Sequence, residues 1–226
     1  RRHDGGAERQ VVRGIDMLKQ ILPSLLAGAG VTLQVFFVTL MLSLPLACLL
    51  QALQQFSGRA LKPLFRGYIT LMRGTPLLLQ LMFIFFGMPY LGLTLSREMS
   101  IYIAFTLNYT AYFIEILRGA LSAVDPGQAE AGKMLGFSRR YIYFRIQLPQ
   151  ALRTAMPAIG NEVLNLVKDT SLIYVLGASE LLKAGRSAVN TYATALPFVF
   201  VGILYLAMCG GFSWILGRIE KRISYY

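Results

Sequence analysis

A glycine-containing segment in the middle of the chain carries residue types that can bind phosphate. Gly127, Gly132 and Lys133 follow the pattern G-x-x-x-x-G-K, in which backbone N–H groups cradle the phosphates of a nucleotide and the lysine reaches their oxygens. The complete pattern continues with a serine or threonine that holds magnesium, whereas Met134 follows the lysine here. A phosphate-binding loop also follows a β-strand, but these glycines fall within or beside an expected helix. The residues therefore argue against a nucleotide site.

The composition places the chain among membrane proteins. Of its 226 residues, 55% are hydrophobic and only 15% are charged, against about 25% charged residues in soluble domains. The net charge of +11 does not indicate nucleic-acid binding, because the basic residues form short blocks between long apolar runs. His3 is the only histidine, and Cys48 and Cys209 both lie inside apolar runs. No metal site or histidine-based catalytic site is therefore expected.

Five runs of the chain are apolar and long enough to cross a bilayer as helices, which takes about 20 residues each. They cover residues 23–50, 74–96, 99–122, 152–176 and 187–217. We therefore expect an all-α integral membrane protein with about five transmembrane helices. A tail at residues 1–22 would precede the transmembrane domain at 23–217, and a second tail would occupy 218–226.

Basic residues are distributed unevenly between the loops. Three basic blocks lie at residues 59–73, 118–153 and 218–222, whereas the opposite loops hold only Arg97, Lys183 and Arg186. Loops rich in lysine and arginine stay in the cytoplasm, so the three blocks are assigned to that side. An odd number of spans then places the N-terminus outside and the C-terminus in the cytoplasm. The basic residues of the N-terminal tail argue the other way, but they are outnumbered.

The loop between the third and fourth runs has the residues that begin and end helices. Asp125 can cap a helix that starts at Pro126 and runs to about residue 135, and Gly136 suits the turn that ends it. Ser138 can cap a second helix over residues 139–147. Thr75 and Pro76 would similarly begin the second span. A helix–turn–helix is thus predicted on the cytoplasmic face.

The same loop resembles the EAA loop of ABC importer permeases, whose form is E-A-A-x-x-x-G, nine variable positions, then I-x-L-P. The spacing is intact here, and Gly132 in place of the second alanine is the one departure. The matching positions are Glu130, Ala131, Gly132, Gly136, Ile146, Leu148 and Pro149. Three further blocks, at residues 73–77, 115–119 and 168–172, look like those of the polar amino acid branch, the histidine/glutamine type.

The resemblance implies an uptake complex in the cytoplasmic (inner) membrane of a bacterium. The chain would be a multi-pass permease subunit beside a second, identical or homologous permease. Two ATP-binding subunits would hold ATP and Mg²⁺, so the permease itself would carry no cofactor and would not be an enzyme. An external solute-binding protein would deliver a polar amino acid. No partner would be a nucleic acid.

The resemblance also implies that the loop over residues 125–149 couples the permease to the ATPase. A short helix parallel to the membrane would sit in a groove of the ATPase subunit, where the small Ala131 and Gly132 allow close approach. Glu130 and Lys133 would pair with charges at the rim, and Gly136 would let the chain turn. An amphipathic helix that rests on lipid headgroups is the alternative from the residues alone.

A polar stripe follows one side of the fourth span. Helical spacing places Asn161, Glu162, Asn165 and Asp169 together, with Lys168 at the edge. Ionisable residues inside a membrane usually serve function. Glu162 could receive the ammonium group of an amino acid, and the two asparagines could donate to its carboxylate. Alternatively, the stripe packs against the partner permease.

Polar residues outside the stripe are assigned to the substrate path, to an ion pair or to an external segment. Thr75 and Asn108 are further candidates for the substrate path. Glu115 and Arg118, one turn apart, are expected to form a structural ion pair within or between helices. Residues 179–190 have helical spacing of charges and form either a short external helix or a solvated linker.

A self-sufficient secondary carrier of amino acids is the alternative function. Such carriers tend to show internal repeats and broken helices in both halves. Five spans and an ATPase-docking motif disfavour that interpretation.

Overall fold

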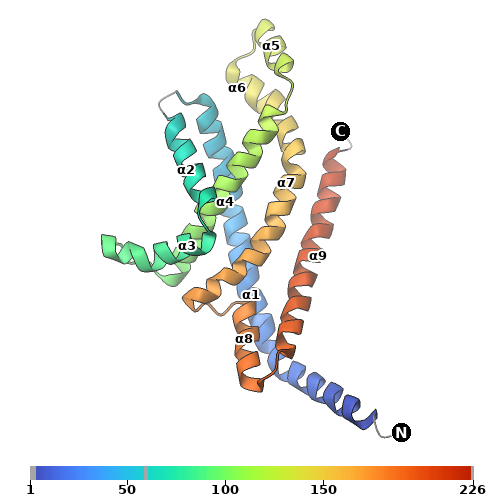
Figure 1. The fold of residues 1–226 in the computed structure, drawn as a ribbon. Helices are drawn as coiled ribbons and strands as arrows, with labels where there is room; N and C mark the ends of the chain where they lie inside the picture. Colours follow the sequence, from blue (N-terminus) through green and yellow to red (C-terminus); the bar gives the residue numbers. More distant parts are fainter. Residues whose placement is uncertain (1–3, 59–60, 225–226) are drawn as a thin grey trace. The chain divides into compact units, whose positions relative to one another are not determined.

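The computed structural model describes residues 4–58 and 61–224, and every regular element within these ranges is a helix. The expected all-α class is therefore confirmed. The elements in chain order (Figure 1) are α1 (Asp4–Phe56), α2 (Lys62–Gly74), α3 (Leu77–Met82), η1 (Phe83–Gly87), η2 (Met88–Leu91), α4 (Arg97–Ser122), α5 (Pro126–Met134), α6 (Arg139–Tyr141), η3 (Ile142–Gln147), α7 (Leu148–Asp169), η4 (Thr170–Leu176), α8 (Leu181–Tyr192) and α9 (Leu196–Ser224).

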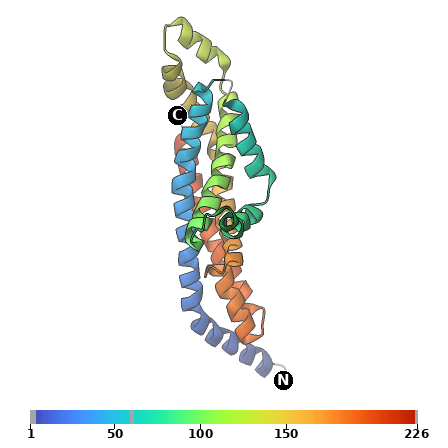
Figure 2. The same ribbon diagram turned by 90° about the vertical axis from the view of Figure 1, so that its left-hand side faces the viewer.

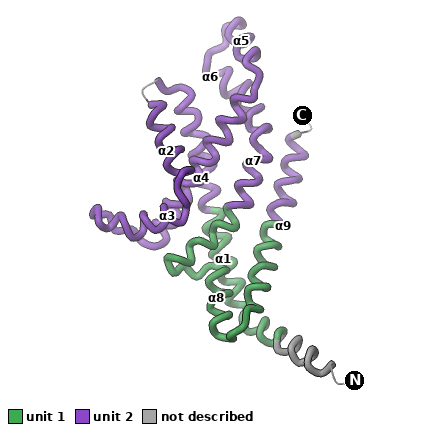
Figure 3. The backbone as a smooth tube through the Cα atoms, in the orientation of Figure 1, with its two compact units in different colours: residues 1–37, 166–210 green, residues 38–165, 211–226 purple. Residues whose placement is uncertain are grey.

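The helices belong to two compact units, shown in different colours in Figure 3. Unit 1 comprises residues 1–37 and 166–210, and unit 2 comprises residues 38–165 and 211–226. In unit 2, α2 and α4 lie side by side (Figures 1 and 2). The hydroxyl of Tyr68 on α2 donates to the carbonyl of Leu107 on α4 at 2.6 Å. This bond ties the two helices together near their midpoints.

Unit 1 has its own apolar core, formed by the first part of α1 with α8 and α9. Its buried members are Met17, Ile21, Leu25, Leu181, Ala188 and Val201. Two glycines allow the helices to approach closely. A Cβ added at Gly28 would lie 2.9 Å from the Cα of Leu181, and one at Gly185 would lie 2.2 Å from a methyl carbon of Val201. The close packing of this unit therefore depends on the absence of side chains at these two positions.

Helix α8 begins at a buried carboxylate. Glu180 is fully buried and accepts the N–H groups of Leu182 and Lys183, each at 2.6 Å. The hydroxyl of Tyr205 donates to the same carboxylate at 3.2 Å. Burial raises the pKa of the Glu180 carboxyl, and the two N–H bonds oppose that rise. The helical alternative for residues 179–190 is thus confirmed, with Glu180 as its N-terminal cap.

The structure contains fewer long apolar helices than the five expected spans. Within the described residues, three helices are apolar and long enough to cross a membrane, over residues 16–56, 97–122 and 196–223. A fourth is reached if α2 and the segment Leu77–Leu91 count as one span that bends by 104°. Helix α7 is not among these helices, and its 22 residues include four charged ones. Five spans therefore remain a prediction.

Two expected boundaries differ in the structure. The last run was expected to begin at residue 187, but residues 187–192 complete α8 and α9 begins at Leu196. Ala193 adopts a left-handed φ of 50° between them, and no charge marks this break in the sequence. The expected limit of the N-terminal tail at residue 22 coincides with no helix end, since α1 continues through it.

The two glycines of α1 provide a matched test of packing in unit 1. Gly28 is buried against the backbone of Glu180 and Leu181, whereas a Cβ at the exposed Gly30 would meet nothing within 4 Å. Gly28→Ala is expected to destabilise the protein by about 1–3 kcal/mol through overpacking. Gly30→Ala should be neutral or stabilising by about 0.5–1 kcal/mol, because alanine favours the helix. Thermal unfolding in detergent measures both, and equal shifts for the two variants would contradict this packing.

Candidate functional site

The loop between α4 and α7 folds into two short helices. The Asp125 carboxylate accepts the N–H of Gly127 at 2.9 Å and caps α5, and the Ser138 hydroxyl accepts the N–H of Tyr141 at 3.2 Å and caps α6. Gly136 ends the first helix with a φ of +80°. The N–H of Phe137 then bonds to the carbonyl of Gly132 at 3.0 Å. The predicted helix–turn–helix is therefore confirmed as secondary structure.

Gly132 explains how the two helices of the loop pack. It is buried, and an added Cβ would lie 3.0 Å and 3.2 Å from side-chain carbons of Ile142 and 3.7 Å from Ile146. The glycine therefore serves contact inside the loop, where an alanine would be crowded. The expected role of Gly132 in contact with another subunit stays a prediction. Ala131 beside it is exposed.

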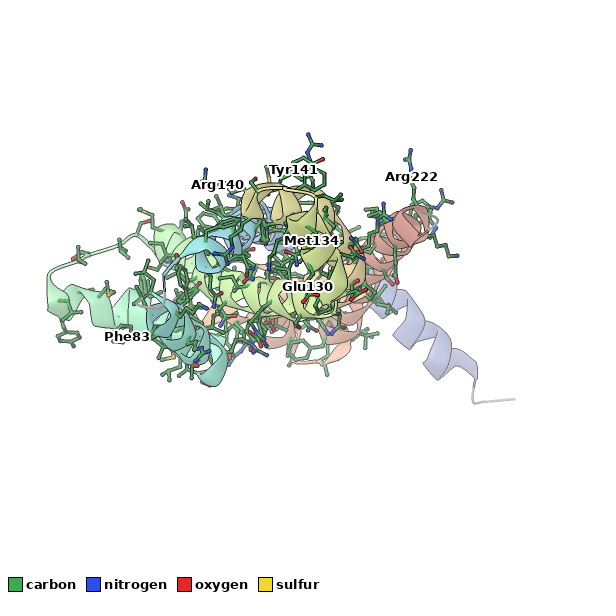
Figure 4. The ribbon with its side chains drawn as sticks, turned by 90° about the horizontal axis from the view of Figure 1, so that it is seen from above. Phe83, Glu130, Met134, Arg140, Tyr141 and Arg222 are labelled. Carbon is green, nitrogen blue, oxygen red and sulfur yellow. The ribbon has the colours of Figure 1, made fainter. Side chains whose placement is uncertain are left out.

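The outer surface of the loop carries exposed apolar side chains that the motif did not reveal. Met134 is 90% exposed and Leu135 is 72% exposed, and Phe137 and Tyr141 are also exposed. Figure 4 shows Met134 and Glu130 on α5 and Tyr141 on α6. Glu130 and Lys133 are exposed beside them. Exposed apolar groups rimmed by charge are typical of a protein-binding surface.

A reciprocal amide pair joins this loop to the start of α7. The side chain of Gln128 donates to Gln150 at 3.0 Å, and Gln150 donates back at 2.5 Å. Gln150 also donates to the carbonyl of Ile146 at 2.7 Å. Neighbouring Leu148 is half-buried and Pro149 is exposed, in the first turn of α7. The amide pair therefore links α5 directly to α7.

The stripe on α7 spans the boundary between the two units. In unit 2, Asn161 is exposed, and Glu162 and Asn165 are half-buried. In unit 1, Lys168 is exposed and Asp169 is half-buried, at the last turn of α7 before η4. All five residues of the stripe lie within α7, as the expected helical spacing requires. Their role as a substrate path stays a prediction.

Thr75 and Asn108 both bond to Gln80 at the bend between α2 and α3. The Asn108 amide donates to the carbonyl of Met72 and to Gln80 Oε1, both at 3.0 Å. Gln80 Nε2 donates to the same carbonyl at 2.9 Å and to the Thr75 hydroxyl at 2.8 Å. Gln80 was not predicted, because a single amide in an apolar run carries no motif. The two candidates therefore belong to one network that holds the bend.

The predicted capping role of Thr75 is wrong. Its hydroxyl donates to the carbonyl of Leu71 at 2.8 Å, one turn back in α2. The N-terminal cap of α3 is Pro76, which offers no side-chain hydrogen bond. Thr75 thus ends the preceding helix and does not begin the next one.

Glu115 and Arg118 lie close together on α4. Arg118 donates to both carboxylate oxygens of Glu115, at 2.8 Å and 2.6 Å. Arg73 of α2 approaches the same carboxylate at 3.6 Å and lies over the ring of Tyr112, 5.4 Å from its centre. The pair is therefore made within α4 and extended to α2.

Comparisons with known proteins agree along almost the whole chain. Residues 43–225 match the family described as binding-protein-dependent transport system inner membrane component. The chain is 34% identical over 198 residues to a putative glutamine transport system permease protein of Rickettsia conorii, which covers 87% of this chain and 91% of that protein. It is 30% identical over 205 residues to an arginine transport system permease protein of Bacillus subtilis, and the match covers 90% of this chain and 94% of that protein.

Solved structures share the fold. A chain in a crystal structure of an amino acid ABC transporter with histidines superposes with a TM-score of 0.84 at 28% identity, over 92% of this chain and 97% of that chain. A chain of the inward-facing MetNI methionine ABC transporter has the same fold, with a TM-score of 0.70 at 19% identity, over 92% and 96%. Since the family match covers most of the residues and relatives above 30% identity align nearly end to end, the chain belongs to the family of binding-protein-dependent transport system inner membrane components.

Proposed function

We propose that the chain is the membrane-spanning permease subunit of an ATP-driven importer of polar amino acids. The observation that carries this proposal is its similarity to amino acid permeases along nearly the whole chain, together with a TM-score of 0.84 to a chain of an amino acid ABC transporter. A second permease, two ATPase subunits and an external solute-binding protein complete the complex. ATP and Mg²⁺ bind to the ATPase subunits. The secondary-carrier alternative has no support in these similarities.

The proposed topology has five spans in a bacterial inner membrane. They are α1, the bent segment from α2 to η2, α4, α7 and α9, with the N-terminus outside and the loop 125–149 and the C-terminus in the cytoplasm. The second of these spans begins earlier than the expected run 74–96, so of the first basic block only its beginning, before α2, stays outside the membrane. Helix α7 carries Arg153, Glu162, Lys168 and Asp169, which lowers its hydropathy. Charged residues within a span face protein or water rather than lipid. A position facing the second permease and the translocation path accounts for this composition.

We assign the coupling function to the loop that contains α5. The exposed Met134 and Leu135 would enter a groove of the ATPase subunit, and Glu130 and Lys133 would meet charges at its rim. The amide pair between Gln128 and Gln150 would carry the displacement into α7. The exposed Ala131 would allow close approach of the ATPase subunit. The other residues of the motif support the loop from within and at its junctions, namely Gly132, Gly136, Ile146, Leu148 and Pro149.

The proposed substrate path follows α7. Glu162 would hold the ammonium or a cationic side chain of the amino acid, Asn161 and Asn165 would contact its carboxylate, and Lys168 and Asp169 would lie at the end of the path. Thr75 and Asn108 act indirectly, since their amide and hydroxyl groups hold the bend of the second span. The bend would shape the wall of the path.

The composition of the purified complex tests the proposed function. After mild solubilisation, the tagged chain should co-purify with an ATPase subunit and, when a cross-linker is used, with a solute-binding protein that contains an amino acid. Mass spectrometry identifies the proteins and the bound ligand. The chain purified alone should hydrolyse no ATP, and turnover by the chain alone would contradict its assignment as a permease.

Charge reversal on α5 tests the coupling loop. Glu130→Arg should lower ATPase association and transport about tenfold or more, as expected when a paired charge at an interface is replaced by a repelling one. The affinity of the binding protein for its ligand should stay unchanged. Glu220→Arg makes the same change at an exposed position of α9 and should transport normally. Normal association and transport in the Glu130 variant would overturn the coupling assignment.

Removal of one charge on α7 tests the substrate path. Glu162→Gln keeps the size of the side chain and should reduce uptake of cationic amino acids about tenfold, while neutral substrates are less affected. Uptake of radiolabelled amino acids into cells gives the measurement. Glu98→Gln, in the exposed first turn of α4, is the matched control. If every amino acid is transported normally by the Glu162 variant, this residue does not belong to the path.

A further inference from the structure

A strongly basic cavity lies in unit 2, apart from the coupling surface and the α7 stripe. It has a volume of about 540 Å³ and is bounded by the end of α1, by α2, by the end of α4 and by the first residue of α6. Its walls hold five cationic side chains and one carboxylate, that of Glu115. The cations are Lys62, Arg66, Arg73, Arg118 and Arg139. The cavity is concave and carries a large excess of positive charge.

The one carboxylate of this cavity is already engaged. Glu115 receives two hydrogen bonds from Arg118 and a longer contact from Arg73. Lys62, Arg66 and Arg139 form no ion pair within the part of the chain that the structure describes. Three cations are therefore left without a counter-charge in one cavity. Such a concentration of like charge attracts a bound anion.

Two glutamines of α1 have side-chain oxygens that lack a hydrogen-bond donor within the described structure. Gln51 is only 4% exposed, and the Oε1 atoms of Gln51 and Gln54 are buried without a donor in the described structure. Both residues line the cavity. A carboxamide can present its N–H₂ group to a phosphate oxygen or its oxygen to a hydroxyl group. The cavity thus suits an anion that carries hydroxyl groups beside its charge.

The position of the cavity points to a lipid as the source of this anion. Lys62 and Arg66 lie at the start of α2, in a basic block assigned to the cytoplasmic side, and the neighbouring α1 and α4 are long apolar helices. Basic pockets between transmembrane helices bind the headgroups of anionic lipids on the cytoplasmic side.

We propose that this cavity binds the glycerophosphate headgroup of an anionic phospholipid, with Lys62, Arg66 and Arg139 on the phosphate and Gln51 and Gln54 on the glycerol hydroxyls. The bound lipid brings α2 together with α6, because Arg139 is the first residue of the loop's second helix. The headgroup would thereby help to fix the coupling loop against unit 2.

Titration of fluorescent phosphatidylglycerol into the detergent-solubilised full chain tests this site. Lys62→Gln combined with Arg66→Gln should weaken binding about twenty-five-fold, since each basic residue at an anionic lipid contributes about five-fold. Both side chains are exposed, so folding should be retained, as thermal unfolding can verify. The control pair Lys221→Gln and Arg222→Gln removes the same charge from the exposed end of α9 and should leave the affinity unchanged. Equal losses in the two pairs would show general surface attraction and overturn the site.

Two further experiments test whether the bound anion is a lipid and which headgroup the cavity prefers. Inorganic phosphate and glycerol 3-phosphate at millimolar concentration should not displace the lipid; displacement would mark a site for a soluble anion and contradict the lipid assignment. The unaltered chain should also prefer phosphatidylglycerol over phosphatidic acid, which lacks the glycerol hydroxyls. Gln54→Leu should abolish that preference, and a preference that persists in this variant would remove the glutamines from the site.

Discussion

The need to satisfy every backbone hydrogen bond without water governs this structure. A chain in lipid must pair its N–H and C=O groups internally, and helices achieve this except at their ends and breaks. The breaks are therefore where polar side chains collect. At the bend of the second span, the amides of Gln80 and Asn108 both donate to the carbonyl of Met72. At the start of α8, the buried Glu180 carboxylate accepts two N–H groups. These residues support the helix breaks.

The loop between α4 and α7, which we propose to be the coupling loop, also satisfies its backbone groups with local side chains. Asp125 and Ser138 satisfy the first N–H groups of its helices, and Gly136 allows the turn between them. Because Gly132 lets the helices pack on each other, the loop can act as one body with an apolar outer surface. The amide pair of Gln128 and Gln150 connects that body to α7. Movement of a partner against the loop would reach the helix that bears the proposed substrate stripe.

Sequence reasoning predicted most features that depend on local chemistry, with the cap at Thr75 as the exception. The caps at Asp125 and Ser138 and the turn at Gly136 follow from residue types alone, and long apolar runs identified most of α1, α4 and α9. Features set by tertiary packing were missed. The break after Gly74 lies at the start of the expected run 74–96, but hydropathy carries no direction, so the 104° bend at this break could not be predicted. The break at Ala193 is uncharged, and α8 was therefore merged in part with α9. Neither the inward position of Gly132 nor the role of Gln80 could be inferred, because both depend on neighbours distant from the local motif.

Reconstitution in liposomes tests most directly the central claim that the chain imports amino acids with the help of ATP and a solute-binding protein. The permease, the ATPase and the solute-binding protein that co-purify with it would be placed in liposomes, and uptake of the labelled amino acid would be followed with and without ATP. The account predicts that accumulation requires ATP on the side of the ATPase subunit and binding protein on the other side, and that an ion gradient alone drives none. Accumulation by the permease alone in response to a proton or sodium gradient would contradict it.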